Sequence, residues 1–242
     1  MEISTVQGCK VVTLRHRSPG HRRAFVFLPG GGYANPITAS HWRPVSRLSR
    51  AAGVDAVVPL YRVSPEGTAE QALALLEEVL ADLIAERGEE VLLGGDSAGA
   101  GLALATAQRH PHGVRAVVLL NPWLDAALAH PATSAVAPWD VILDLRDLRQ
   151  WAAVWADGLP TTDAMVSPMN GPCMGLPPVH ILTGGRDAFL PDAFELHRRL
   201  VVAGNSGTLM YSPDGNHADG LISPATPEGR NAHDAVVRWL QT

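Results

Sequence analysis

The sequence predicts an α/β protein with a mostly parallel central sheet and helices on both of its faces. Short apolar runs alternate along the chain with longer amphipathic stretches. The short runs are apolar throughout, which is typical of strands buried on both faces of a parallel sheet. A length of 242 residues is compatible with one domain, so we expect a single domain over 1–242.

The expected elements follow one another in regular β-α order. Strands are predicted at 24–28, 55–60, 91–94, 114–120, 179–184 and 207–212. Helices are predicted at 40–53, 68–88, 98–110, 191–204 and 226–241. The clearest helix, 68–88, has leucines at helical spacing and opens with Thr68 three residues before Gln71, a capping-box pattern. The stretch 6–14 is expected to add one antiparallel strand at a sheet edge.

The region 121–176, called the inserted segment below, interrupts this rhythm. It is rich in Pro, Trp and Asp, has one helical stretch at 140–158 and contains no strand pattern. Insertions of this size commonly lie over the carboxyl edge of a sheet, so we expect a small lid. Its tryptophans are expected to pack inside the protein or to line an apolar pocket.

Composition excludes several classes of function. A formal net charge of −5 without a basic cluster argues against a nucleic-acid partner. Two cysteines, Cys9 and Cys173, indicate neither a disulfide framework nor a zinc site, and no metal or cofactor is expected. No apolar run approaches the roughly 18 residues that a membrane span needs. The first residues do not resemble a signal peptide, so we expect a cytoplasmic protein.

The first chemical motif is GDSAG at 95–99, between a predicted strand and a predicted helix. It matches G-x-S-x-G, in which a serine stands on a sharp turn and its neighbours must be almost free of side chains. Ser97 is therefore a candidate nucleophile. The simpler alternative is a tight turn in which Ser97 caps the following helix.

The second motif is FLPGGGY at 27–33, after the first central strand. Three glycines let the backbone approach a ligand closely and direct its amides at a developing oxyanion. A flexible loop or a phosphate cradle would use similar residues. A dinucleotide fingerprint fits poorly, because Pro36 and polar residues follow where a helix would have to begin.

A nucleophilic serine needs a base and an acid that orients it. His217 lies on a glycine-bearing loop after the last predicted strand, and Asp187 lies three residues beyond strand 179–184. The order Ser97, Asp187, His217 is the order of an α/β-hydrolase triad. Asp192 and Glu195 lie further along and are expected to cap a helix or face solvent.

With these residues the chain resembles the hormone-sensitive-lipase-like bacterial esterases, which implies the α/β-hydrolase fold. The resemblance extends from about residue 24 to the end. Its motifs are YRVSPE at 61–66, GDSAG at 95–99, NPWLD at 121–125 and the stretch 166–189.

The resemblance also implies an oxyanion hole made by the amides of Gly31, Gly32 and Ala98. The chain departs from the family pattern at Pro29, where the family has a histidine before the glycines, and at Ala218, which follows the candidate base.

The favoured hypothesis is a serine carboxylesterase acting on small-molecule esters with short or medium acyl chains. An amide hydrolase of the same fold, such as an aryl formamidase or a peptidase, is a second hypothesis. A non-catalytic ligand receptor on this fold is the third. The edge strand near 207–212 offers backbone groups through which a homodimer could pair.

Overall fold

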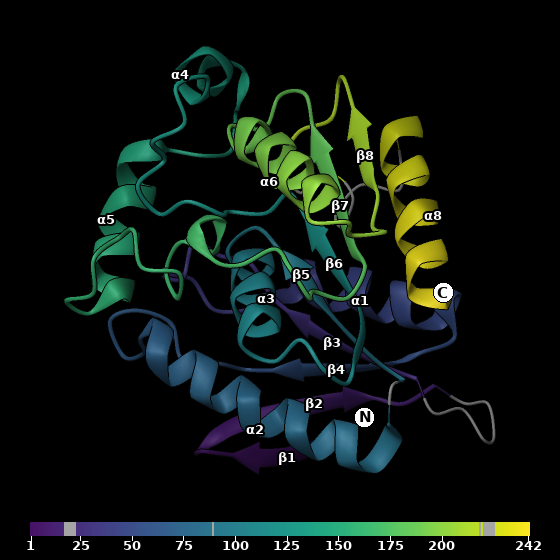
Figure 1. Ribbon diagram of the computed structural model, residues 1–242. Helices are drawn as coiled ribbons and strands as arrows, with labels where there is room; N and C mark the ends of the chain where they lie inside the picture. The colour runs from purple at the N-terminus through teal and green to yellow at the C-terminus, as the bar shows by residue number, and fades with distance from the viewer. Residues whose placement is uncertain (17–22, 89, 218, 220–225) are drawn as a thin grey trace.

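The computed structural model describes residues 1–16, 23–88, 90–217, 219 and 226–242. Its centre is an eight-stranded sheet of order β1-β2-β4-β3-β5-β6-β7-β8 (Figure 1). The strands are β1 (Glu2–Val6), β2 (Cys9–Leu14), β3 (Ala24–Leu28), β4 (Asp55–Pro59), β5 (Val91–Asp96), β6 (Val114–Leu120), β7 (Val179–Gly184) and β8 (Leu209–Ser212). The helices are α1 (Ala39–Ala52), α2 (Ala69–Arg87), α3 (Ala98–Arg109), α4 (Thr133–Val136), α5 (Leu145–Ala156), α6 (Leu190–Val202) and α8 (Pro227–Gln241).

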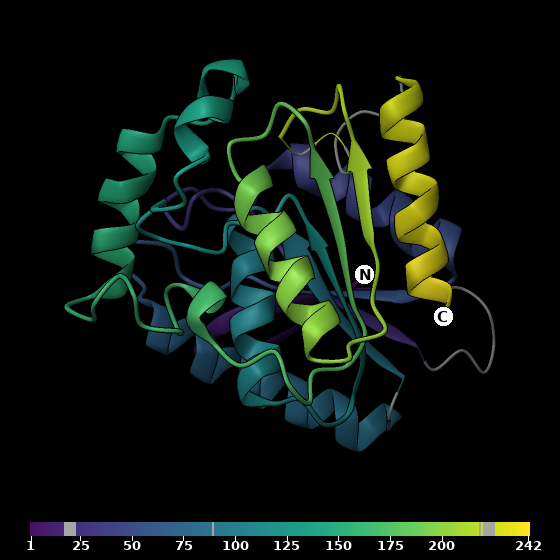
Figure 2. The same ribbon diagram turned by 45° about the horizontal axis from the view of Figure 1, so that its top comes forward.

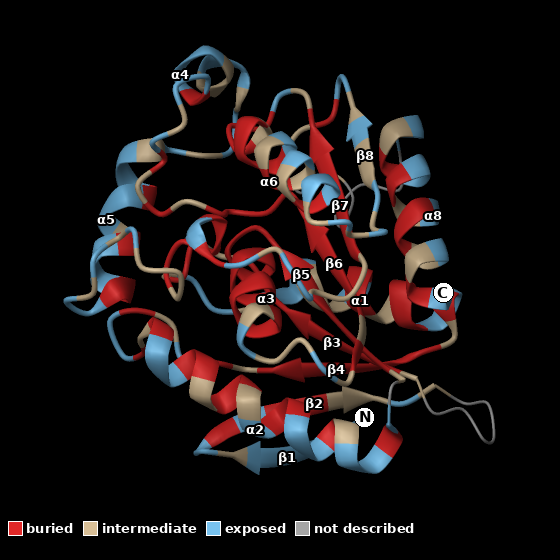
Figure 3. Ribbon diagram, viewed as in Figure 1, coloured by how far each residue is buried: buried red, intermediate tan, exposed pale blue. Residues whose placement is uncertain are grey.

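The predicted fold class is confirmed. From β4 across to β8 every neighbouring pair of strands is parallel, and only β1 and β2 run antiparallel to their neighbours. The central strands are buried along their length (Figure 3). Continuous apolar runs form such strands because both faces of the sheet are covered.

Helices cover the two faces in separate layers, as Figure 1 shows. Within β3, Phe25 and Phe27 pack with residues of α1 and α8, whereas Val26 and Leu28 pack with residues of α2 and α3. Successive side chains of a strand point to opposite faces, so one apolar strand supplies both cores.

The amino-terminal edge differs from the sequence prediction. The stretch 6–14 is not one strand but the end of β1, a turn and all of β2. Gln7 and Gly8 have φ values of 48° and 73°, and β1 pairs with β2 across them. Two consecutive residues with positive φ form the tight turn that suits the twist of a hairpin.

The loops after β3 and β5 are brought together by the strand order. β3 lies between β4 and β5, and Leu28 at its end is in register with Gly95 of β5. After β3 the chain first adds β4 on one side of it and later adds β5 on the other side. Ligands of open α/β sheets bind at the carboxyl ends of strands at such a switch point.

The inserted segment contains no strand in any of its residues, all of which the structure describes. Its main helix is α5, which begins at Leu145 rather than at 140 because Asp144 accepts from the amides of Arg146 and Asp147 and caps it. A short helix, α4, and a 3-10 turn at Ala137–Trp139 precede it. Figure 2 shows α4 and α5 on the opposite side of the molecule from α8.

Candidate active site

Ser97 occupies the turn between β5 and α3 with a strained backbone, its φ being 54° and its ψ −122°. Its amide donates to the carbonyl of Leu120 (2.8 Å), and its own carbonyl accepts from the amide of Trp123 (3.0 Å). The side chain makes no capping hydrogen bond to α3. The helix-cap alternative therefore does not describe this serine, and its strained conformation is typical of a functional turn.

Glycines beside Ser97 allow the turn to pack against β3. A Cβ on Gly95 would lie 2.3 Å from the carbonyl oxygen of Leu28, and a Cβ on Gly99 would lie 2.0 Å from the same oxygen. Real side chains do not approach a carbonyl so closely. The two glycines of the motif are therefore required by close packing of the helix against the sheet.

The structure brings together the three predicted triad side chains, each from a loop at the carboxyl edge. The Nε2 of His217 lies 3.0 Å from the Oγ of Ser97, and its Nδ1 lies 3.2 Å from Oδ2 of Asp187. Their exposed fractions are 6 % for Ser97, 0 % for Asp187 and 4 % for His217. An alcohol, an imidazole and a carboxylate in this order form a path for a proton.

Asn121 also belongs to this site, although the sequence reasoning did not assign it a role. Its Nδ2 donates to Oδ2 of Asp187 (2.6 Å), while the amide of Phe189 donates to Oδ1 (2.9 Å). Asn121 directly follows β6 and has a φ of 48°, a conformation that asparagine tolerates better than most residues. Its position at the end of a strand was the signal that could have identified it.

The imidazole of His217 is buried among carboxylates. Burial alone would lower its pKa, but Asp187 beside it, and after it the negative charges of Asp140 and Asp96, outweigh burial and raise the pKa above the usual value. The protonated ring that forms when a base accepts a proton is therefore stabilised here.

The glycine loop after β3 reaches the nucleophile turn at Gly30, where an added Cβ would lie 3.0 Å from the Cβ of Ser97. Gly31 and Gly32 have φ values of 133° and 63°. A Cβ on Gly32 would lie 2.4 Å from the ring of Trp151 in α5. Among the described residues neither amide donates to a backbone carbonyl. The amide of Ala98 is at the start of α3, where intrahelical partners are lacking.

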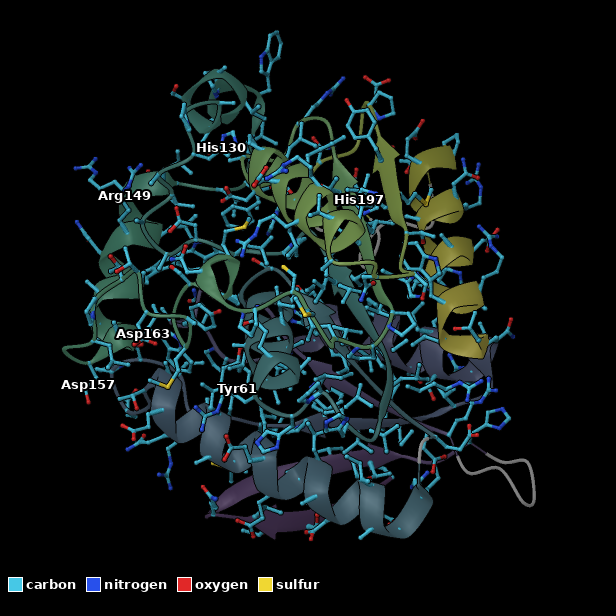
Figure 4. All side chains as sticks on the ribbon, in the orientation of Figure 1. Tyr61, His130, Arg149, Asp157, Asp163 and His197 are labelled. Atoms are coloured by element: carbon cyan, nitrogen blue, oxygen red, sulfur yellow. The ribbon has the colours of Figure 1, made fainter. Side chains whose placement is uncertain are left out.

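Pro29 stands where the family has a histidine, and other groups brace the glycine loop here. The hydroxyl of Tyr61 donates to the carbonyl of Pro29 (2.6 Å), and the amide of Gly30 donates to Oδ1 of Asp96 (2.9 Å). Burial raises the pKa of Asp96, although His41, 3.8 Å away, and the Gly30 amide oppose that shift. Tyr61, labelled in Figure 4, is buried in the core shared by α2 and α3.

A row of stacked aromatic rings runs from the inserted segment to the base. Trp155 stacks on Tyr33 with ring centroids 4.5 Å apart, and Tyr33 stacks on Trp123 at 5.3 Å. Trp123 stacks on Phe189 at 5.9 Å, and the edge of Phe189 meets His217 at 5.2 Å. These rings fill the space between α5 and the site, so Trp123 and Trp155 have the packing role that the sequence indicated.

Asp192 is expected from the sequence to cap a helix or to face solvent, but the structure buries it. It lies in the first turn of α6 and is only 4 % exposed. Burial, followed by the charges of Asp125 and Glu195, raises its pKa to about 7. The prediction failed because the amphipathic pattern of α6 did not show that the inserted segment covers its first turn.

The described residues contain no group of three or more His, Cys, Asp or Glu arranged to hold a metal ion. Within the same part of the chain, no helix has both the length and the apolar character needed to cross a bilayer. Ala218, the second departure from the family pattern, is outside the described residues.

Comparisons with known proteins agree with this fold. The model of a family described as having the alpha/beta hydrolase fold matches residues 25–219. An acetyl-hydrolase of Streptomyces hygroscopicus is 32% identical over 100% of this chain and 82% of its own length. A triacylglycerol lipase of Mycobacterium tuberculosis is 30% identical over 93% of this chain, which spans only 48% of that protein. A solved esterase of the bacterial hormone-sensitive lipase family has a TM-score of 0.89 and 27% identity, covering 99% of this chain and 83% of that one.

The chain belongs to the α/β hydrolase fold family. Within that family its similarity is to the hormone-sensitive-lipase-like esterases, as the sequence motifs predicted.

Proposed function

We propose that this protein is a serine carboxylesterase in which Ser97 is the nucleophile, His217 the general base and Asp187 the residue that orients the imidazole. Membership of the carboxylester hydrolases follows from the family and from relatives that are esterases and lipases. The residue roles are supported above all by one observation, the 3.0 Å contact between Oγ of Ser97 and Nε2 of His217.

The proposed reaction passes through an acyl-enzyme. Ser97 attacks the ester carbonyl while His217 takes the hydroxyl proton, and the ring then gives that proton to the leaving alcohol. Asp187 favours the tautomer with the proton on Nδ1 and stabilises the imidazolium. Water, deprotonated by the same imidazole, releases the acid and regenerates Ser97.

The amides of Gly31, Gly32 and Ala98 are proposed to hold the oxygen of the tetrahedral intermediate. This role is supported by the two glycine amides, which donate to no backbone carbonyl within the described part of the chain, and by the bracing of the loop by Tyr61 and Asp96. Fixed donors need no reorganisation when the negative charge develops, and each one lost typically costs about 2.7–4 kcal/mol.

A preference for short or medium acyl chains is supported by the aromatic row beneath α5. Trp123 and Trp155 are 2 % and 0 % exposed, so their rings occupy space that a long acyl chain would need. We infer that the inserted segment serves as a small lid, because α5 presses Trp151 against the glycine loop at Gly32.

The test uses p-nitrophenyl acetate, butyrate, octanoate and palmitate together with matched p-nitroanilides. Ser97→Ala should lower kcat/KM for the esters by at least about 10⁴-fold while the circular dichroism spectrum stays unchanged. Ser134→Ala, at an exposed position of α4, is the matched control and should keep full activity. A fluorophosphonate probe should label Ser97 in the wild type.

Retention of ester turnover by the Ser97→Ala variant would refute the assigned nucleophile. Faster cleavage of the anilides than of the esters would instead favour the amide-hydrolase hypothesis. Highest activity on the palmitate ester would contradict the inferred acyl preference.

We further propose a cytoplasmic location and a homodimer paired through β8. β8 is the last strand of the sheet, so its outer edge has backbone groups without a neighbouring strand in the described chain. Light scattering after size exclusion tests the dimer, since a monomer at all concentrations would exclude it. Fractionation of the producing cell tests the location.

A further inference from the structure

Asp140, in the inserted segment, reaches the loop of the proposed catalytic acid. Its Oδ2 accepts a hydrogen bond from the amide of Ala188 (2.8 Å), the residue that follows Asp187. Its Oδ1 accepts from the amides of Ile142 and Leu143 at 2.9 Å each. One carboxylate therefore closes its own turn and joins that turn to the acid loop.

The residues on either side of Asp140 in the sequence are exposed to solvent. Trp139 is 67 % exposed and Val141 is 84 % exposed, whereas Ala188 at the far end of the hydrogen bond is 1 % exposed. A turn with apolar side chains in solvent has little burial to hold it in place. The polar attachment to Ala188 is therefore important for fixing this part of the inserted segment.

Asp140 also contributes charge at the base. Within the described residues, the strongest charges acting on the imidazole come from three elements: Asp187 after β7, Asp140 on the inserted segment and Asp96 at the end of β5. Asp96 in turn lies 3.8 Å from His41 of α1. Among the described residues, Ser97 meets the ring at Nε2 and the apolar edge of Phe189 lies against it. All three acidic side chains favour a protonated ring.

We propose that Asp140 is a positioning residue of this site, which fastens the inserted segment to the loop of the catalytic acid and directs a second negative charge toward His217. This inference rests on the proposed function of the triad. The proposal adds to the site a residue that lies outside the sheet. Because Asp140 both holds the inserted segment and acts on the imidazole, the position of the segment and the basicity of His217 depend on each other.

The experiment compares Asp140→Asn, Asp140→Ala and the control Asp144→Asn. Asp144 is on the same segment and also caps a turn with its carboxylate, but it bonds to Arg146 and Asp147 instead of the acid loop. Each variant is tested for kcat and KM, for the pH profile of kcat/KM and for the His217 pKa by NMR. The His217 ring signal is assigned with a His217→Gln variant.

Removing the negative charge makes protonation of the ring less favourable. Asp140→Asn should therefore move the acid limb of kcat/KM and the NMR pKa of His217 to lower pH by about 0.5 unit, less than the 1–3 units of a directly contacting charge. Asp140→Ala should also lower kcat by about tenfold, because the acid loop loses its attachment. KM should change less than kcat, and Asp144→Asn should leave the pH profile unchanged.

An unchanged acid limb and an unchanged His217 pKa in Asp140→Asn would overturn the proposal, even if the variant were less stable. If Asp140→Ala fails to fold, Asp140→Asn still decides the matter, since it keeps the size of the side chain. A shifted His217 pKa in a protein whose ester turnover does not depend on Ser97 would refute the proposed function but leave the role of Asp140 at the ring intact.

Discussion

The nucleophile turn and the inserted segment hold their residues in place by different means. At the turn, Gly95 and Gly99 bring α3 into backbone contact with β3, and the strained φ of Ser97 is fixed by hydrogen bonds on both sides. The inserted segment packs into the core through buried side chains such as Trp123 and Trp155, and it meets the loops of the site through side-chain contacts, such as Trp151 on Gly32 and Asp140 on Ala188.

Because of this difference, the residues proposed for the chemistry are held by the sheet, whereas the residues that surround them come from the inserted segment. Every triad side chain comes from a loop directly attached to a strand, so the sheet sets the distances between them. The inserted segment contributes two tryptophans of the aromatic row and, as we propose, a small lid and an additional charge. Variants at the seam between the two regions should therefore alter stability, pH dependence or rate by moderate amounts, whereas loss of Ser97 should abolish the proposed reaction.

The largest effect that we expect at the seam involves Asp192, which lies near Asp125 of the inserted segment. Its pKa rises from 3.8 to about 7, chiefly through burial. In the unfolded chain the carboxyl ionises near pH 4, so wild-type stability should fall as the pH rises from about 4 to 7. A difference of about three pH units between the folded and unfolded pKa corresponds to a loss of up to about 4 kcal/mol in the free energy of unfolding. Asp192→Asn should remove this loss.

Urea unfolding at pH 4.5 and pH 8 measures this effect. Relative to wild type, the Asp192→Asn variant should gain stability between the two pH values. Asp144→Asn serves as the flat control, because backbone amides lower the pKa of Asp144 and its carboxyl is therefore ionised in both the folded and the unfolded chain over this pH range. Its difference from wild type should stay nearly constant between pH 4.5 and pH 8. If the difference in free energy of unfolding between Asp192→Asn and wild type stayed constant with pH, the burial of an uncharged Asp192 carboxyl at the seam would be contradicted.

A smaller effect is expected where α5 meets the glycine loop. Gly32 and Gly53 have similar φ values, 63° and 72°, but a Cβ on Gly32 would strike Trp151 whereas a Cβ on Gly53 meets nothing within 4 Å. Gly53→Ala should cost about 1–2 kcal/mol through backbone conformation alone. Gly32→Ala should cost about 1–3 kcal/mol more through overpacking, and it should also lower kcat.

Equilibrium unfolding and ester turnover of both variants test this comparison. Gly53→Ala should retain the wild-type kcat because it lies at the end of α1, away from the site. Equal losses of stability for the two variants would mean that α5 moves freely away from the glycine loop.

The smallest effect that we expect is at Asn121, within the sheet-borne part of the site. Asn121→Gly retains a residue that accepts the φ of 48° but loses the hydrogen bond to Asp187. A hydrogen bond to a charged group contributes about 1.5–3 kcal/mol, so kcat/KM should fall by about 10- to 150-fold. Gln7→Gly, with the same φ of 48° in the β1–β2 turn, is the matched control for the backbone and should leave kcat/KM unchanged.

The sheet could be predicted from the sequence because its strands are continuous apolar runs and its helices have an apolar stripe with clear ends. Helix α2 illustrates this, with Thr68 accepting from the amide of Gln71 at its start and Gly88 at its end. The motif around Ser97 could be interpreted because only glycine fits beside it. The hairpin at Gln7 was missed since a single Q-G pair is a weak turn signal within an apolar stretch.

The seam could not be predicted in the same way. Asp140, Asp192 and Trp151 act through residues distant in the sequence, and no local period marks such contacts. Their burial depends on how the inserted segment lies on the sheet, which neither composition nor spacing specifies. Asn121 is intermediate, because its place after β6 follows from the strand pattern but its partner Asp187 does not.

The close approach of α3 to β3 also has an evolutionary consequence. Where a methyl group on Gly99 would overlap the carbonyl of Leu28, selection has almost no acceptable alternatives to explore. Trp139 and Val141, largely in solvent, can be exchanged at little cost. Diversification toward new esters should therefore accumulate in the inserted segment, and directed-evolution libraries placed there should yield more folded variants than libraries around the nucleophile.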